Sequence, residues 1–256
     1  MKTIPSVYAY CDRWCERCAF GARCEAFAAD ATVRKPENME ADDEHNRVFW
    51  TKLEESLPAT LKYIEQTAKE KNADLYDFPG ISTRAKFDLF QRKAVNNMVL
   101  KAGRKYEDRV DDFLDDRADA GEIAMDEWQP GSVFKLVNNR FSDSEKERAN
   151  NLLAVVMRYQ LQLYLKLSRA YYSKGREEEA GETIQEPKES DGTAKVCLVL
   201  IQRSMLAWRG LQNYFPDQKD EIDETLFLLM RMKNRLENEF PEAWNFVRPG
   251  FDEPIK

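Results

Sequence analysis

The chain has little of the chemistry on which most enzymes depend. Among its 256 residues are one histidine, ten glycines, ten prolines and five cysteines. A Ser-His-Asp or Cys-His mechanism could run only through His45, and its surroundings, DDEHNRVFW, match no catalytic motif. Glu-x-x-His pairs, a phosphate-binding loop, a dinucleotide fingerprint and kinase motifs are also absent, so the sequence predicts no particular reaction.

A long uninterrupted apolar run is missing as well. The most apolar stretch, residues 152–172, is broken by Arg158, Lys166 and Arg169, so it predicts a buried core helix and no membrane span. The first residues show no signal-peptide pattern, and we expect a cytoplasmic protein with no membrane contact. The 46 acidic and 39 basic side chains give a net charge of −7, which argues against wholesale wrapping of nucleic acid.

Strand signals are nearly absent, whereas apolar residues recur at helical spacing along most of the chain. The stretch 120–139 predicts a loop with at most one short strand. The helix that begins after residue 42 is expected to kink or restart at Pro58, and Ser82 is a good N-cap for the next one. Helices are expected over residues 43–71, 82–119, 142–172, 194–214 and 217–240. The sequence therefore predicts an all-α fold, a helical bundle of five or six helices.

Composition divides the chain into two parts. Residues 1–41 form a cysteine-rich amino-terminal metal-binding segment, and residues 42–256 form the helical bundle domain. Inside the bundle domain, residues 173–193 are polar and charged and contain Gly and Pro, so they predict a loop. Residues 241–256 are expected to pack as an extended carboxy-terminal strap over the bundle. Three aromatic residues of the strap are the expected anchors, namely Trp244, Phe246 and Phe251.

Four of the five cysteines lie within fourteen positions near the amino terminus. Cys11, Cys15, Cys18 and Cys24 follow the spacing Cys-x3-Cys-x2-Cys-x5-Cys, and the fifth, Cys197, stands alone in an apolar stretch. A cytosolic chain of this length needs no disulfide framework, so a tight group of thiols predicts a metal or redox site. Four thiolates supply a complete coordination shell for a tetrahedral zinc ion or an iron-sulfur cluster. Cys197 is expected to be a packing residue of the core.

The spacing of the ligands bears on the choice between zinc and a cluster. Structural zinc sites usually join two cysteine pairs that are a dozen or more residues apart, whereas here the whole shell lies in one short run. A 4Fe-4S cluster is wider than a single ion and accepts several closely spaced ligands, so we expect the cluster and keep one Zn2+ as the alternative.

The run CERCAFGARC, from Cys15 to Cys24, resembles the Cys-x2-Cys-x5-Cys element that binds a 4Fe-4S cluster in the Cas4 and AddB nuclease families. Phe20 takes the place of an aromatic residue that often follows the second cysteine there. Those families have Pro where Ala19 stands, draw their fourth cysteine from far upstream and carry a nuclease core that this chain lacks. The resemblance implies an iron-sulfur site and no nuclease activity, and the whole chain resembles no family.

The side chains around the cysteines suggest how such a site could be protected. Five aromatic residues lie close by in the sequence and could exclude water from a cluster or dock the segment on the bundle: Tyr8, Tyr10, Trp14, Phe20 and Phe27. Three arginines could offset the negative charge of thiolate ligands or pair with neighbouring acids: Arg13, Arg17 and Arg23.

The stretch from Arg84 to Arg109 has a local excess of positive charge, because it contains eight basic and three acidic residues. Nucleic acid is a possible partner there through Arg84, Lys93, Lys101, Arg104 and Lys105.

Three functional hypotheses therefore stand. The first is an iron-sulfur protein that uses its cluster for electron transfer, redox sensing or structure, with a protein or redox partner. The second is a zinc-stabilised, non-enzymatic helical adaptor. The third is a nucleic-acid-associated module.

Overall fold

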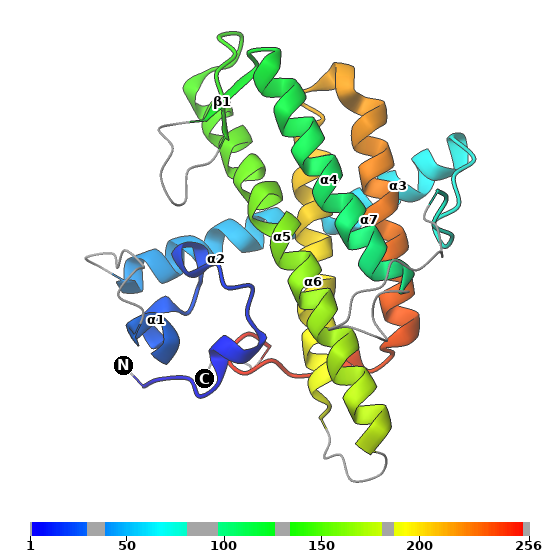
Figure 1. The fold of residues 1–256 in the computed structure, drawn as a ribbon. Helices are drawn as coiled ribbons and strands as arrows, with labels where there is room; N and C mark the ends of the chain where they lie inside the picture. The colour runs from blue at the N-terminus through cyan, green and yellow to red at the C-terminus, as the bar shows by residue number, and fades with distance from the viewer. Residues whose placement is uncertain (1, 30–38, 81–96, 126–133, 181–186, 253–256) are drawn as a thin grey trace.

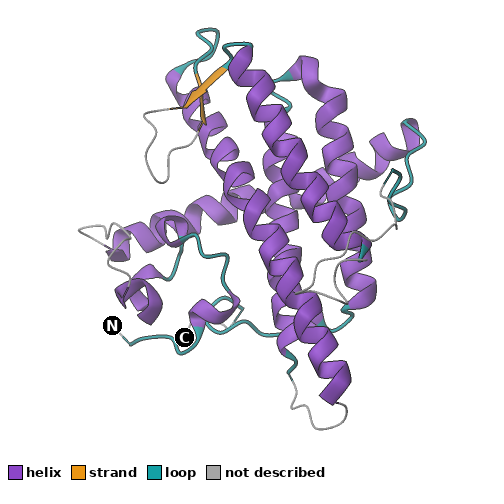
Figure 2. Cartoon of the chain, in the orientation of Figure 1, coloured by secondary structure: helices purple, strands orange, loops and turns teal. Residues whose placement is uncertain are grey.

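The computed structural model of the chain describes residues 2–29, 39–80, 97–125, 134–180 and 187–252. This described part consists almost entirely of helices and loops (Figure 2). Its six longest helices are α2 (Met39–Glu54), α3 (Leu57–Glu70), α4 (Met98–Asp119), α5 (Asp143–Ala180), α6 (Glu189–Leu211) and α7 (Lys219–Glu239). The five-residue helix α1 (Glu25–Ala29) precedes them. The prediction of an all-α helical bundle is confirmed.

Helices α4 to α7 run up, down, up and down beside one another and form a four-helix bundle (Figure 1). Each packs on the next, and α7 closes the ring against α4. Large side chains fill the centre: Trp208, Tyr106 and Phe113 are at most 1% exposed. The indole of Trp208 donates a hydrogen bond of 3.2 Å to the Tyr106 hydroxyl, so the polar atoms of both rings are paired inside the core. Within the described residues, none of the helices is both long and apolar enough to cross a membrane.

Helices α2 and α3 pack across the bundle against α6 and α7. The predicted restart is confirmed, because α2 ends at Glu54 and Pro58 lies in the first turn of α3. Proline is tolerated there because the first amides of a helix have no partner within the helix. The buried carboxylate of Asp223 on α7 accepts a hydrogen bond of 2.7 Å from Tyr63 on α3 and one of 2.7 Å from Lys71, the residue directly after α3. These bonds hold α3 in place.

Two predictions in the middle of the chain were wrong in detail. A continuous helix over residues 82–119 is not formed, because Asn97 is extended and its side chain accepts the amide of Val99, which makes Asn97 the N-cap of α4. The expected cap Ser82 lies outside the described residues. The stretch after α4 forms two short strands where at most one was expected, β1 (Ile123–Met125) and β2 (Phe134–Leu136), paired antiparallel.

The polar stretch 173–193, expected to be a loop, is helical at both ends. Helix α5 continues to Ala180 and α6 begins at Glu189, while residues 181–186 lie outside the described part. The first turn of α6 is buried, and Ser190 donates both its amide and its hydroxyl to the carboxylate of Glu177 on α5. Composition misled here because the polar side chains bond to one another instead of to water.

The carboxy-terminal strap, residues 240–252, leaves α7 and returns along α6 to the cysteine segment (Figure 1). Lys195 on α6 holds it, because its ammonium donates to the carbonyls of Trp244 and Phe246 and pairs with Asp252 at 2.8 Å. Phe246 is buried as expected, whereas Trp244 is 39% exposed and its indole donates a hydrogen bond of 2.8 Å to Glu237 on α7. Residues 253–256 lie outside the described part.

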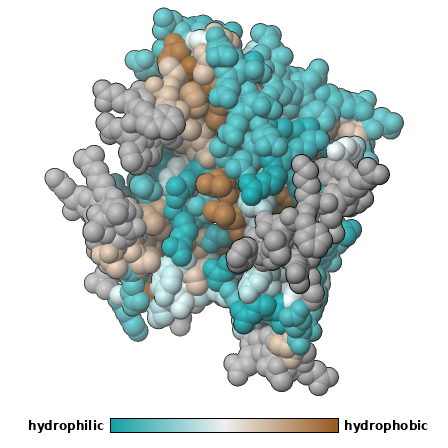
Figure 3. All heavy atoms as spheres, in the orientation of Figure 1, coloured by the Kyte–Doolittle hydropathy of each residue, from teal (hydrophilic) through white to brown (hydrophobic). Residues whose placement is uncertain are grey.

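The face shown in Figure 3 is mostly hydrophilic. A small apolar patch in its centre lies over α5, which exposes Leu161 and Leu165 by about half. Isolated exposed apolar side chains are normal on a folded protein.

Candidate metal-cluster site

Three 3-10 turns shape the cysteine segment, and the cysteines lie at their ends. The turns are η1 (Val7–Tyr10), η2 (Cys15–Arg17) and η3 (Gly21–Arg23). Cys11, Cys18 and Cys24 each directly follow one of these turns and have extended backbone, while Cys15 begins the second turn. A short turn followed by an extended residue reverses the chain sharply, so side chains several residues apart can face one space.

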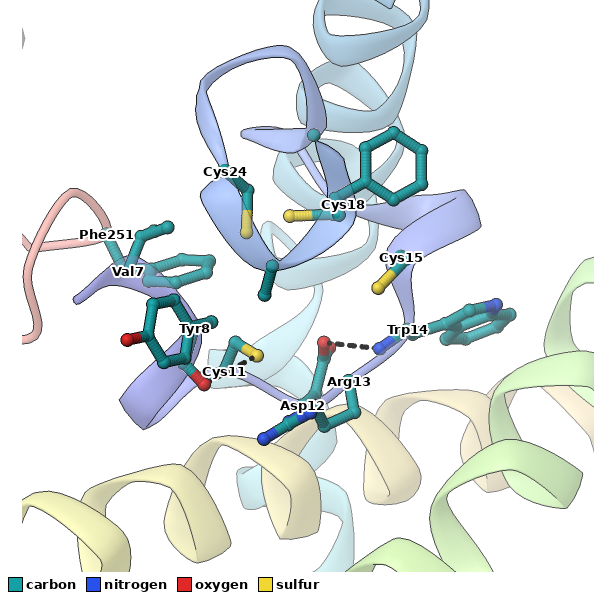
Figure 4. Close-up of a pocket in the computed structure, with 13 residues that line it drawn as sticks. Val7, Tyr8, Cys11, Asp12, Arg13, Trp14, Cys15, Cys18, Cys24 and Phe251 are labelled. Atoms are coloured by element: carbon teal, nitrogen blue, oxygen red, sulfur yellow. Dashed lines mark hydrogen bonds between the residues drawn. The ribbon is translucent and has the colours of Figure 1, made fainter. Parts of the chain in front are cut away.

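The structure brings the four cysteines together. Cys11, Cys15, Cys18 and Cys24 all line one cavity of about 60 Å³. Figure 4 shows their sulfur atoms directed toward this shared space, with Val7, Tyr8 and Phe251 closing one side. All four side chains are partly exposed. The fifth, Cys197, is fully buried in α6, as expected for a packing residue, and burial raises its pKa to about 12.

The four thiols surround a space and do not converge on a point. In the parts of the chain that the structure describes, no group of three or more His, Cys, Asp or Glu side chains stands close enough to hold a metal ion. A tetrahedral zinc ion with Zn–S bonds of about 2.3 Å needs its sulfur ligands within roughly 4 Å of one another. A single ion therefore requires the thiols to move inward.

Burial favours the protonated form of three of the thiols, those of Cys11, Cys15 and Cys18. Burial raises the pKa of Cys11 and of Cys18, and it raises the pKa of Cys15 to about 11. The Cys11 thiol donates to the carbonyl of Tyr8 at 3.3 Å. The amide of Phe20 donates to the sulfur of Cys18 at 3.4 Å, the kind of bond that stabilises a thiolate ligand. Binding of a metal or a cluster must therefore release protons.

One face of α2 holds the backbone of the cysteine loop. Asp43 accepts the amides of Gly21 and Ala22 at 3.0 and 3.1 Å. Asn46 donates to the carbonyls of Glu16 and Cys18, and the indole of Trp50 donates to the carbonyl of Arg17 at 2.8 Å. Asp43, Asn46 and Trp50 are three and four residues apart, so they project from the same side of the helix. They replace the sheet or helix bonds that this loop lacks.

A second anchor joins the loop to the bundle. The carboxylate of Asp12 accepts the buried Tyr159 hydroxyl of α5 at 2.7 Å and the guanidinium of Arg203 on α6 at 3.2 Å. Its other oxygen accepts the amide of Trp14. The ring of Trp14 packs edge-on against Tyr159 and Trp50. The short stretch between Cys11 and Cys15 is thereby fixed to α2, α5 and α6.

The strap completes the site from the opposite end of the chain. Phe251 lines the cysteine cavity and packs edge-on against Phe20 at 4.8 Å. Tyr10 packs against Phe246 at 4.7 Å. The rings of Tyr10 and Phe246 both pack on Gly192 of α6, where an added Cβ would come within 2.6 Å of each ring. Glycine is therefore required at that position for the loop and the strap to meet on α6.

The predicted shield of aromatic residues is formed in part. Tyr8, Trp14 and Phe27 line the cavity, while Tyr10 and Phe20 contact the strap instead. The arginines have separate surroundings. Arg13 lines the cavity, Arg17 donates to Asn151 on α5, and Arg23 donates to the carbonyl of Lys2.

Sequence reasoning missed the residues that hold the site from outside it. These are Asp43, Asn46, Tyr159 and Arg203. The buried Lys166 on α5 was also missed, and it interacts electrostatically with Cys11. Burial lowers the pKa of Lys166, and the charge of the Cys11 thiolate would raise it. The only signal in the sequence is the recurrence of Asp43, Asn46 and Trp50 along one side of a helix, and it looks like an ordinary polar surface.

The remaining predicted groups that the structure describes do not line the cysteine cavity. His45 is exposed on α2. Of the basic residues proposed to contact nucleic acid, Arg84 and Lys93 lie outside the described part. Arg104 stacks on the ring of Tyr164 at 3.7 Å and pairs with Glu107. The nucleic-acid hypothesis stays a prediction.

Comparisons of the chain with protein-family models, curated proteins and solved structures return no match.

Proposed function

We propose that the chain is an iron-sulfur protein in which Cys11, Cys15, Cys18 and Cys24 bind one 4Fe-4S cluster. The observation that carries this proposal is that all four thiols line the same cavity. Four free thiols from one short segment provide the full ligand set that such a cluster needs, with no other residue required.

The size of the cavity favours a cluster over a single ion. Its volume of about 60 Å³ is several times the roughly 10–15 Å³ that holds one water molecule. One zinc ion would leave most of this space empty, whereas a cubane of iron and sulfide is wider than a single ion. The apolar side chains of Val7, Phe27 and Phe251 on its walls limit access of water and oxidants.

The arrangement supports a redox role more than a purely structural one. The bundle of α4 to α7 has its own buried core, and the cysteine segment is attached to its surface. All four thiols are partly exposed, so a cluster would lie near the surface, where electron exchange with a protein partner is possible. We therefore propose electron transfer or redox sensing as the use of the cluster.

The test is an anaerobic purification followed by a visible spectrum and measurement of iron, sulfide and zinc on one sample. The proposal predicts a brown protein with broad absorption near ~400 nm and about four iron and four sulfide per chain. A colourless protein with about one zinc per chain would contradict it and make the segment a structural clip of a helical adaptor. Melting of the protein before and after metal removal then separates the roles, because a redox role predicts that the bundle survives.

A further inference from the structure

A second, larger cavity lies directly beside the cysteine cavity. It has a volume of about 320 Å³ and shares Asp12, Cys18 and Phe251 with its neighbour. Its walls come from α2, α6, the cysteine loop and the strap, so it lies where all four meet. The volume falls at the lower end of the roughly 300–1,000 Å³ typical of small-molecule sites.

The charge on its walls is positive. Four arginines from four separate segments line it, namely Arg17, Arg47, Arg203 and Arg248. The two acids on its walls are Asp12 and Glu54. Four positive and two negative side chains leave a balance of plus two. Both acids already bond to Arg203, at 3.2 Å for Asp12 and 2.9 Å for Glu54, so the excess rests on the other three arginines.

Those three arginines differ in how far they are neutralised. Arg47 forms an ion pair with Glu44, and both side chains are well exposed, so this ion pair contributes little. Arg17 donates to the neutral amide of Asn151. Arg248 is held by Asp252 of the strap. Arg17 and Arg47 therefore keep N–H donors for a ligand, since each guanidinium carries five of them.

The rest of the lining is suited to an organic group. Apolar and aromatic side chains contribute, among them Phe20 of the cysteine loop, Trp50 of α2, Leu57 at the start of α3 and Leu206 of α6. Thr51 and Gln202 add neutral polar groups. A few polar groups converging within apolar walls are the usual composition of a ligand site.

We propose that this cavity binds a small organic dianion, with a phosphate monoester as the preferred form. A phosphate monoester carries a charge of about −1.5 to −2 at pH 7, opposite in sign to the arginines on the walls. A planar guanidinium group can donate two parallel hydrogen bonds to two oxygens of one phosphate. The proposal does not depend on the identity of the metal group, but a ligand in this cavity would lie against Cys18, next to any cluster bound there.

The experiment is isothermal titration of the protein, as purified anaerobically, with adenosine monophosphate as the probe and neutral adenosine as its uncharged counterpart. Arg47→Glu is the main variant, because its exposed side chain can be changed without disturbing the fold. Lys62→Glu, on the exposed side of α3 and away from the cavity, makes the same change in net charge. Val199→Phe fills the cavity without changing its charge.

The proposal predicts that adenosine monophosphate binds and adenosine does not. Arg47→Glu should weaken binding by roughly tenfold or more, since a charge-assisted hydrogen bond is lost and a repulsive charge is added. Lys62→Glu should change binding by less than about twofold because of screening by salt, and Val199→Phe should abolish it. Equal binding of the two probes, no binding of either, or equal effects of Arg47→Glu and Lys62→Glu would overturn the proposal.

Discussion

The bundle and the cysteine segment are stabilised in different ways. Trp208, Leu163 and Tyr159 of the bundle are at most 1% exposed, and regular helices satisfy the backbone around them. In residues 2–29, by contrast, short turns predominate, and side chains of α2 supply the partners for backbone groups of the loop. The bundle is therefore a scaffold with its own stability, whereas the cysteine loop depends on that scaffold for its shape.

The largest effect is expected from a change inside the bundle. Trp208→Ala removes a buried indole that contacts Phe113 at 4.9 Å and bonds to the Tyr106 hydroxyl. The free energy of unfolding should fall by about 3–5 kcal/mol, because the substitution leaves a large cavity. Urea unfolding followed by circular dichroism measures it. Tyr76→Ala, in the loop after α3 and 71% exposed, is the control and should cost less than about 1 kcal/mol. Equal losses would contradict the comparison.

A smaller and more local effect is expected in the loop. Asn46→Ala leaves the carbonyls of Glu16 and Cys18 without their donor, at a cost of about 1–3 kcal/mol. Hydrogen exchange should speed up across the loop and iron retention should fall, while exchange in α6 stays unchanged. His45→Ala, at the exposed neighbouring position, should change neither. Uniform faster exchange throughout the bundle would show that the two regions unfold together.

The smallest effect concerns the strap. Burial alone would raise the pKa of Asp252, but hydrogen bonds from Arg248 and Lys195 outweigh it and lower the pKa to about 2. Because the folded-state pKa lies below the unfolded value of about 3.9, the contribution of Asp252 to stability is present above pH 4 and is lost as the pH falls toward 2. With solvent screening it amounts to about 1 kcal/mol.

Comparison with Asp252→Asn isolates this contribution from those of the other acids. The difference in unfolding free energy between the original protein and the variant should shrink as the pH falls from 4 to 2, in a urea titration at each pH. A difference that stays constant with pH would mean that Asp252 does not hold the strap through its charge.

The bundle was the more predictable of the two regions. The periodicity of apolar residues predicted α6 and α7 to within a few residues, because a helix buried on one side must repeat its apolar positions. The prediction of a loop over residues 173–193 was wrong because composition shows neither of two contacts made there. Glu177 bonds to Ser190, and the rings of Tyr10 and Phe246 pack on Gly192. Such contacts join distant residues and leave no local pattern.

The grouping of the four cysteines could be predicted from the sequence, whereas the residues that support them could not. The close spacing of four cysteines is a local signal, and the structure brings those cysteines around one cavity. Asn46 and Arg203 lie far from them in the sequence, and their polar side chains suggested a solvated surface. The arginine-lined cavity escaped prediction for the same reason, since its walls come from four separate segments.

The most direct test of the central claim is the iron and sulfide content of two anaerobically purified variants, Cys18→Ala and Cys197→Ala. Cys18 lines the cavity, whereas Cys197 is buried in α6. The account predicts that Cys18→Ala loses the iron, the sulfide and the visible absorption, and that Cys197→Ala keeps all three. Retention of a full complement of iron and sulfide by Cys18→Ala, or its loss from a folded Cys197→Ala, would contradict the assignment of the four amino-terminal cysteines as the ligands.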